Sequence, residues 1–140
     1  MQGMSIWFWF DGQAEDAANF YAELFGGEVT GIERTPEGTP FPAGQVMTAS
    51  FRILGQDFNA LNGGPQFQHS SATSFMVPCD GQAEIDRLWA ALSDGGTEQQ
   101  CGWVIDRSRR GGLLGRSSPK KCVKNSPAFK CSAARSSTCW

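Results

Sequence analysis

The sequence predicts an α+β fold made of two βαβββ modules, with the second module truncated or degraded. Three observations lead to this fold class. A short motif near the start of the chain recurs later, each copy opens an amphipathic helix, and composition changes abruptly after residue 106. We therefore expect residues 1–106 to form the folded domain and residues 107–140 to form a basic tail, rich in Ser and Cys and largely disordered.

The internal repeat sets the order of the elements. Residues 11–15 and 80–84 share the sequence Asp-Gly-Gln-Ala-Glu, an offset of 69, and at the same offset the Gly-Gly pair at 26–27 returns at 95–96. Separate matches in one register indicate a duplicated unit, which has to be recognised before a fold is assigned.

Each copy begins with a strand followed by a helix. Short apolar runs at residues 6–10 and 74–79 have the length of a strand. Next come apolar residues spaced three and four apart, as on one face of a helix, with acidic residues in the first turn, where the helix dipole favours them. The Gly-Gly pair should end each helix, since Gly adopts the left-handed geometry of a C-terminal cap.

Three further strands complete the first copy, at about residues 28–34, 46–53 and 58–62. The repeat offset places the last two strands of the second copy at 115–122 and 127–131. The first of these segments contains two Ser, a Pro and a pair of Lys, which are unfavourable in a central strand. We therefore expect the second module to lack its closing strands.

Several motifs follow one another in a characteristic order along the chain. They are Trp9-Phe10-Asp11-Gly12-Gln13-Ala14-Glu15, Asn19-Phe20-Tyr21, Ala60-Leu61-Asn62-Gly63-Gly64-Pro65, Ser74-Phe75-Met76-Val77, Glu84-Ile85-Asp86-Arg87-Leu88-Trp89 and Gln100-Cys101-Gly102-Trp103-Val104. Together they resemble the PhnB-like group of the vicinal oxygen chelate superfamily, which includes glyoxalases and bleomycin-resistance proteins. Members often bear the label 3-demethylubiquinone-9 3-methyltransferase. The resemblance implies eight strands around a half-open cleft, commonly in a dimer.

In catalytic members of the superfamily, His, Glu or Gln side chains hold a divalent metal. The corresponding first-strand positions are Met4 and Thr73, and a third position falls near Asn62. Thioether suits soft copper and hydroxyl is a weak ligand, so no metal and no cofactor are expected. A methyltransferase of the Rossmann kind needs a Gly-rich turn from strand to helix, whereas the turn at residues 63–65 precedes a strand.

The resemblance thus implies a small-molecule-binding protein without the usual metal site, and no residue is assigned a catalytic role. Trp7 and Trp9 alternate with two Phe, so one aromatic pair should face the ligand side of the sheet and the other the helix. The alternative is an enzyme that acts through Cys101 or His69. The less specific interpretation is that the His is a solvated loop residue and that the Cys is buried and inert. The candidate ligand-binding residues are Trp7, Trp9, Asn62, Gly63, Gly64, His69, Cys101 and Trp103.

The net charge changes sign after residue 106, where the composition also changes. Three basic residues stand against fourteen acidic ones up to residue 106, a net charge of −11, and nine basic residues without an acid follow, a net charge of +9. One interpretation is a basic arm for nucleic acid. The other is a frameshift, because codons for Trp-Gln-Ile-Val-Pro, the closing strand that the resemblance implies, give Gly-Arg-Ser-Ser-Pro when read one nucleotide late. That peptide stands at residues 115–119, and the frameshift is favoured although residues 108–112 require a small length difference as well.

Location and partners follow from what the sequence lacks. No apolar run reaches the ~18–20 residues of a membrane span, and no Lys or Arg precedes the first apolar run, as a signal peptide would require. We expect a cytoplasmic homodimer that binds an unknown small molecule, with neither a membrane nor nucleic acid as partner.

Overall fold

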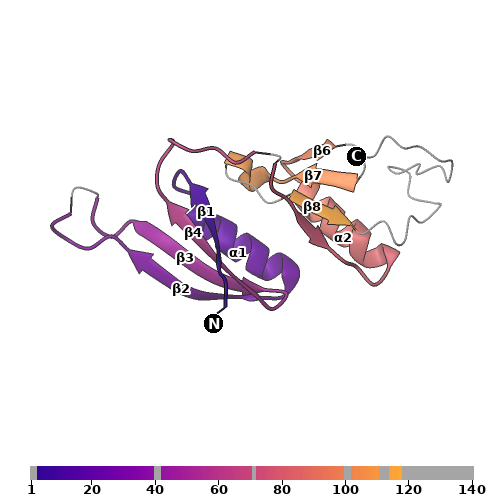
Figure 1. Cartoon of the computed structure of the whole chain (residues 1–140), viewed down its shortest axis with the longest axis horizontal. Helices are drawn as coiled ribbons and strands as arrows, with labels where there is room; N and C mark the ends of the chain where they lie inside the picture. Colours follow the sequence, from indigo (N-terminus) through magenta and orange to yellow (C-terminus); the bar gives the residue numbers. More distant parts are fainter. Residues whose placement is uncertain (1–2, 40–41, 71, 100–101, 111–113, 118–140) are drawn as a thin grey trace. The chain divides into compact units, whose positions relative to one another are not determined.

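The structure, a computed structural model, describes residues 3–39, 42–70, 72–99, 102–110 and 114–117. The chain divides into two compact units, Met1–Ser70 and Ser71–Trp140 (Figure 1). Each unit contains a four-stranded sheet and an α-helix that lies between its first two strands in the chain. The βαβββ order predicted for the first module is confirmed, and the second module repeats it.

The first unit matches the predicted strands closely. Its sheet has the order β1-β4-β3-β2, in which β1 runs parallel to β4 and the other pairs are antiparallel. The last strand begins two residues earlier than expected, because the turn before it is tighter. The elements are β1 (Ile6–Phe10), α1 (Ala14–Phe25), β2 (Glu28–Arg34), β3 (Val46–Ile53) and β4 (Gln56–Asn62).

In the first unit α1 packs on one face of the sheet (Figure 1), and an aromatic stack forms the core between them. Tyr21 of α1 stacks on Phe51 of β3, with ring centroids 6.0 Å apart, and Phe51 stacks on Phe58 at 5.3 Å. Phe8 of β1 continues the stack from Phe58 at 5.7 Å. Phe10, which is 1% exposed, lies in the same core, so the Phe pair of β1 faces the helix. Each such ring contributes roughly 1.5–3 kcal/mol by burial.

The two glycines after each helix have different functions. Gly26 and Gly95 adopt positive φ, +66° and +71°, as the predicted helix ends require. A Cβ on Gly27 would run into the carbonyl oxygen of Arg52, and a Cβ on Gly96 would run into that of Ile105. The second glycine of each pair therefore lets the third strand of its module approach the end of the helix.

The second unit repeats the topology of the first with shorter elements. Its strand order is β5-β8-β7-β6, again with the first and fourth strands of the module parallel. The registers coincide, since Phe75 pairs with Gly115 as Ile6 pairs with Phe58. The elements are β5 (Phe75–Val77), α2 (Gln82–Ser93), β6 (Thr97–Gln99), β7 (Trp103–Ile105), a 3₁₀ turn (Arg107–Arg110) and β8 (Leu114–Ser117).

The prediction that the second module lacks its closing strands was wrong. β7 is its third strand and β8 its fourth, well before the positions given by the offset of 69. The offset fails because Thr97 already pairs with Ile105, so the long connection at residues 35–45 of the first unit is reduced to residues 100–102. Residues 118–140, and the predicted disorder of the tail with them, lie outside the described residues.

The second module is nevertheless reduced. Its strands have three or four residues, against five to eight in the first. By register, Gly115 occupies the position of Phe58 and Ser117 that of Ala60, both of which are core positions in the first unit. None of the helices formed by the described residues has the length and apolar character needed to cross a membrane.

Candidate functional site

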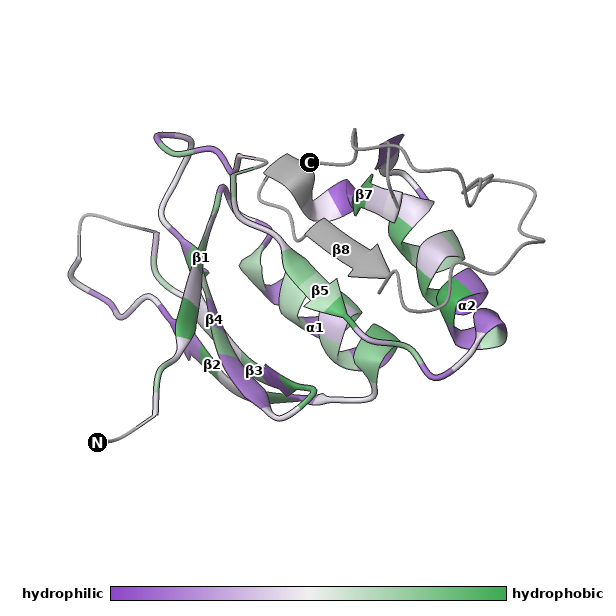
Figure 2. Ribbon diagram, turned by 45° about the vertical axis from the view of Figure 1, so that its right-hand side comes forward, coloured by the Kyte–Doolittle hydropathy of each residue, from purple (hydrophilic) through white to green (hydrophobic). Residues whose placement is uncertain are grey.

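The face of the first sheet that points away from α1 carries polar side chains. Along β3 the residues alternate between apolar and polar, and the colours in Figure 2 change accordingly. Alternate residues of a strand point to opposite faces, so the buried apolar set faces α1 and the other set faces away. We call this second set the polar face; it comprises Trp7, Trp9, Glu28, Glu33, Thr48, Ser50, Arg52, Asp57, Asn59 and Leu61.

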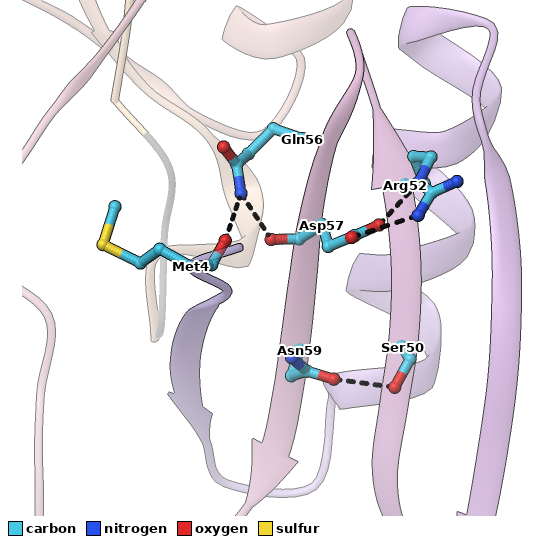
Figure 3. Close-up of polar contacts among 6 residues, drawn as sticks. All are labelled: Met4, Ser50, Arg52, Gln56, Asp57 and Asn59. Carbon is cyan, nitrogen blue, oxygen red and sulfur yellow. Dashed lines mark hydrogen bonds and ion pairs between the residues drawn. The ribbon is translucent and has the colours of Figure 1, made fainter. Parts of the chain in front are cut away.

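The centre of the polar face is a row of residues in register across the sheet. Trp7 of β1 pairs with Asn59 of β4, which pairs with Ser50 of β3, and the row ends at Gly31 of β2. The hydroxyl of Ser50 donates to Asn59 Oδ1 at 2.7 Å (Figure 3). Trp7 is 59% exposed, and its Nε1 donates to Ser5 Oγ at 3.2 Å. An indole surface and an oriented carboxamide thus lie next to each other.

An ion pair lies in the next row. Arg52 Nε and Nη2 donate to the two carboxylate oxygens of Asp57, at 2.6 and 3.1 Å (Figure 3). The hydrogen bond from Arg52 lowers the pKa of the Asp57 carboxyl, and the same contact raises the pKa of Arg52. Both side chains are about half exposed, so the pair fixes the orientation of these groups more than it stabilises the fold.

Trp9 packs against the loop that follows β4. Its Nε1 donates to the carbonyl oxygen of Gly64 at 2.7 Å, and the Phe67 ring meets it edge-on at 4.9 Å. A Cβ on Gly63 would overlap the Trp9 indole, so glycine is needed there for the ring to lie over the backbone. The Gly63-Gly64 turn, proposed as a ligand contact, holds Trp9 in place in this structure.

Asn62 has its amide engaged within the first unit. Its Oδ1 accepts hydrogen bonds from the backbone N–H groups of Gly12 and Ala14, at 3.1 and 2.9 Å, and its Nδ2 donates to the carbonyl oxygen of Val46 at 2.9 Å. Gln13, the residue before α1, makes no side-chain cap. Asn62 therefore caps the helix from the end of β4, and this geometry favours a structural role.

His69 is also engaged by its own unit. Its Nε2 lies 2.6 Å from the carbonyl oxygen of Trp9, a distance at which the nitrogen carries the proton and donates. The ring is half-buried, with its centroid 5.8 Å from that of Phe8 and 5.7 Å from that of Phe10. These contacts hold the loop after β4 against β1, which is a structural role for the His.

The other candidates belong to the second unit. Trp103 is half-buried in β7, and Cys101 lies outside the described residues. Cys79, also in this unit, has a thiol whose pKa is raised by burial and by the nearby Glu84 and Asp80 carboxylates, which makes it a poor nucleophile at neutral pH. The structure thus brings Trp9, Asn62, Gly63, Gly64 and His69 together at one end of the first sheet.

Sequence reasoning missed Ser50, Asn59, Arg52 and Asp57. The signal was present, because the polar residues of β3 and β4 alternate with apolar ones in both strands. What alternation could not show is that Ser50 bonds to Asn59 and Arg52 to Asp57 across the hairpin.

The donor groups do not fit a divalent metal site. At the first-strand positions Met4 is 79% exposed and Thr73 is exposed. The Met4 carbonyl oxygen accepts a hydrogen bond from Gln56, and the amide of Asn62 is bonded as described above. In the part of the chain that the structure describes, no three His, Cys, Asp or Glu residues are grouped so that they could hold a metal ion.

The comparisons with known proteins decide the family. The family model described as 3-demethylubiquinone-9 3-methyltransferase matches residues 2–109. The chain belongs to this family. A PhnB protein of Bacillus cereus bearing the same description is 28% identical, with a TM-score of 0.72 over 84% of this chain and 100% of that one. The resemblance to the PhnB-like group that the sequence shows is therefore confirmed.

More distant structures show the same fold. Protein PA1353 of Pseudomonas aeruginosa is 19% identical, with a TM-score of 0.63 over 84% of this chain and 98% of that one. The fosfomycin resistance protein FosX of Listeria monocytogenes is 10% identical, with a TM-score of 0.60 over 86% of this chain and 94% of that one. At these identities the likeness concerns the fold alone. A search of curated proteins found no match.

Proposed function

We propose that this PhnB-like protein binds a small organic molecule on the polar face of its first unit, without a resident divalent metal. The observation that carries the proposal is the half-buried Ser50–Asn59 pair beside the exposed indole of Trp7. Small-molecule sites combine aromatic surface with a few oriented polar groups, and this part of the sheet has both.

Binding is a better account than methyl transfer, despite the family description. The Gly63-Gly64 turn lies between β4 and β5 and packs on Trp9, whereas a nucleotide-type cofactor on a Rossmann sheet needs a Gly-rich turn from strand to helix. An enzyme acting through His69 is disfavoured because the imidazole Nε2 is bonded to the Trp9 carbonyl.

A small-molecule screen tests this function. Ligand-observed NMR on the full chain should find compounds whose binding is lost in Trp7→Ala and kept in Leu54→Ala. Leu54→Ala is the control because Leu54, in the β3–β4 turn, is 65% exposed and Trp7 is 59% exposed. A screen without hits, or hits that bind Trp7→Ala as well as the native chain, would contradict the proposal.

The proposal includes three properties that rest on the family resemblance and the donor set: no bound metal, a homodimer, and a cytoplasmic location. Elemental analysis of protein purified without chelator should find far less than one Zn, Ni or Mn per chain. Light scattering should give twice the 15.2 kDa mass of the chain. A stoichiometric metal would contradict the first property and a monomer the second, and neither result would contradict the proposal that the polar face binds a ligand.

A further inference from the structure

The orientation of Asn59 leaves its hydrogen-bond donors available. A serine hydroxyl has one proton, and that of Ser50 is directed at Asn59 Oδ1. The two N–H groups of the amide therefore lie on the side of Asn59 away from Ser50, as Figure 3 shows. Among the described residues, Ser50 is the one partner with which the Asn59 side chain forms a hydrogen bond. A half-buried amide with two unused donors suits a ligand that offers an acceptor.

Trp7 supplies a flat surface next to those donors. It pairs in register with Asn59 on the neighbouring parallel strand, a spacing of roughly 4.8 Å between strands. The hydrogen bond from its Nε1 to Ser5 restrains the indole while most of the ring remains exposed. At the other end of the row, a Cβ built on Gly31 would meet nothing within 4 Å. A planar ring of a ligand that stacks on the Trp7 indole would thus have its edge close to the Asn59 amide.

The charges around this row oppose an anionic ligand. The polar face carries Glu28, Glu33 and Asp57 against one cation, Arg52. That guanidinium donates through two nitrogens to Asp57 and pairs in register with Glu28. A ligand carboxylate or phosphate would therefore meet net negative charge without an unpaired cation on this face.

We infer that the polar face recognises a planar, uncharged group that bears a carbonyl-type hydrogen-bond acceptor, with Trp7 stacking on the plane and Asn59 Nδ2 donating to the acceptor. The inference rests on the proposed function and names its ligand class. Ser50 is the positioning residue in this arrangement, because its hydroxyl holds the amide with the donors outward.

Benzamide and benzoate form a matched pair of test compounds, equal in size and shape and different in charge. Each is titrated into ¹⁵N-labelled full-length protein while the Trp7 indole N–H and the Asn59 carboxamide resonances are followed. Benzamide should shift both signals, with a dissociation constant at least fivefold below that of benzoate. Both compounds offer Asn59 Nδ2 an acceptor, so the difference comes from repulsion of the benzoate charge by the acidic side chains of the face; a repulsion of about 1 kcal/mol corresponds to about fivefold in affinity.

Two variants separate recognition from folding. Asn59→Asp keeps an acceptor for Ser50 and removes the donors, so benzamide binding should weaken about fivefold or more. Asn19→Asp makes the same chemical change at an exposed position of α1 and should leave binding unchanged. Equal affinity for the two compounds, or undiminished benzamide binding by Asn59→Asp, would overturn the inference. Library hits that depend on Trp7 would still support the proposed function in that case.

Discussion

At the scale of single residues, side chains that look available in the sequence prove to be part of the framework. Asn62 joins three segments, because its amide bonds to Gly12, Ala14 and Val46. These partners lie as far as 50 positions away in the chain. No local pattern could reveal such contacts, so Asn62 was predicted as a ligand contact on the position of its turn alone.

Replacing Asn62 should therefore cost stability. Asn62→Ala leaves backbone donors at the start of α1 without their acceptor, at a cost of about 1–3 kcal/mol. Asn62→Asp keeps the acceptor and should cost less. Urea unfolding measures both free energies. Asn59→Ala, on the same strand, removes a single side-chain hydrogen bond and should have the smallest effect; a larger effect for Asn59→Ala than for Asn62→Ala would contradict the capping role.

Gly63 offers a second test of the framework. Gly63→Ala places a methyl group where the Trp9 indole lies, so the ring must move and its hydrogen bond to Gly64 should break. The Trp9 indole N–H signal is expected to shift and to exchange faster with solvent. Gly31→Ala is the matched control, since nothing lies within 4 Å of its Cβ position. Equal behaviour of the two variants would mean that Trp9 does not lie over Gly63.

At the scale of elements, the β3–β4 hairpin carries a pH-dependent contact. Because Arg52 lowers the pKa of Asp57 in the folded chain, the pair contributes stability above the unfolded pKa of Asp, about 4. This contribution is lost as pH falls through the lower folded value. NMR titration of the Asp57 carboxyl should give a midpoint below the usual range, which returns to that range in Arg52→Gln. The same midpoint in both proteins would show that the ion pair does not form in solution.

Elements could be predicted where apolar residues mark them. β1 and β3 agree with the predicted ranges because their apolar residues form a strand-sized run or alternate. β2 also agrees, since it fills the segment between the Gly-Gly pair and the turn-rich stretch that follows residue 34. β8 could not be predicted, since Leu-Gly-Arg-Ser does not alternate in this way and its position follows from the pairing of β7. Of the polar face, the sequence predicted only that one aromatic pair of β1 would lie on it, because the bonds across the hairpin depend on register.

At the scale of the whole molecule, the second module retains the topology of the first, but its last strand lacks apolar residues at two positions that belong to the core in the first unit. Gly115 and Ser117 take the register positions of Phe58 and Ala60. With the small length difference that it requires at residues 108–112, the frameshift hypothesis would place Trp and Ile at these two positions, and therefore on the face that carries the core in the first unit. The β8 register thus agrees with that hypothesis, which remains a prediction.

Restoring the strand should stabilise the protein. A chain that continues after Arg107 with Phe-Gly-x-Ser-Trp-Gln-Ile-Val-Pro should melt at a higher temperature, since one or two kcal/mol moves a domain of this size by roughly 4–10 °C. Differential scanning calorimetry compares the two chains. If they melt alike and cooperatively, the present sequence after residue 107 is a genuine structural element and the frameshift hypothesis is wrong.

The central claim is that the polar face of the first unit is the ligand surface. A chemical-shift map of ¹⁵N-labelled protein with the tightest compound from the screen tests this claim most directly. We predict that the perturbed signals cluster at Trp7, Ser50 and Asn59, while those of Asn19 on α1 stay in place. Perturbations confined to α1 or to the second unit, with the signals of Trp7 and Asn59 unchanged, would contradict it.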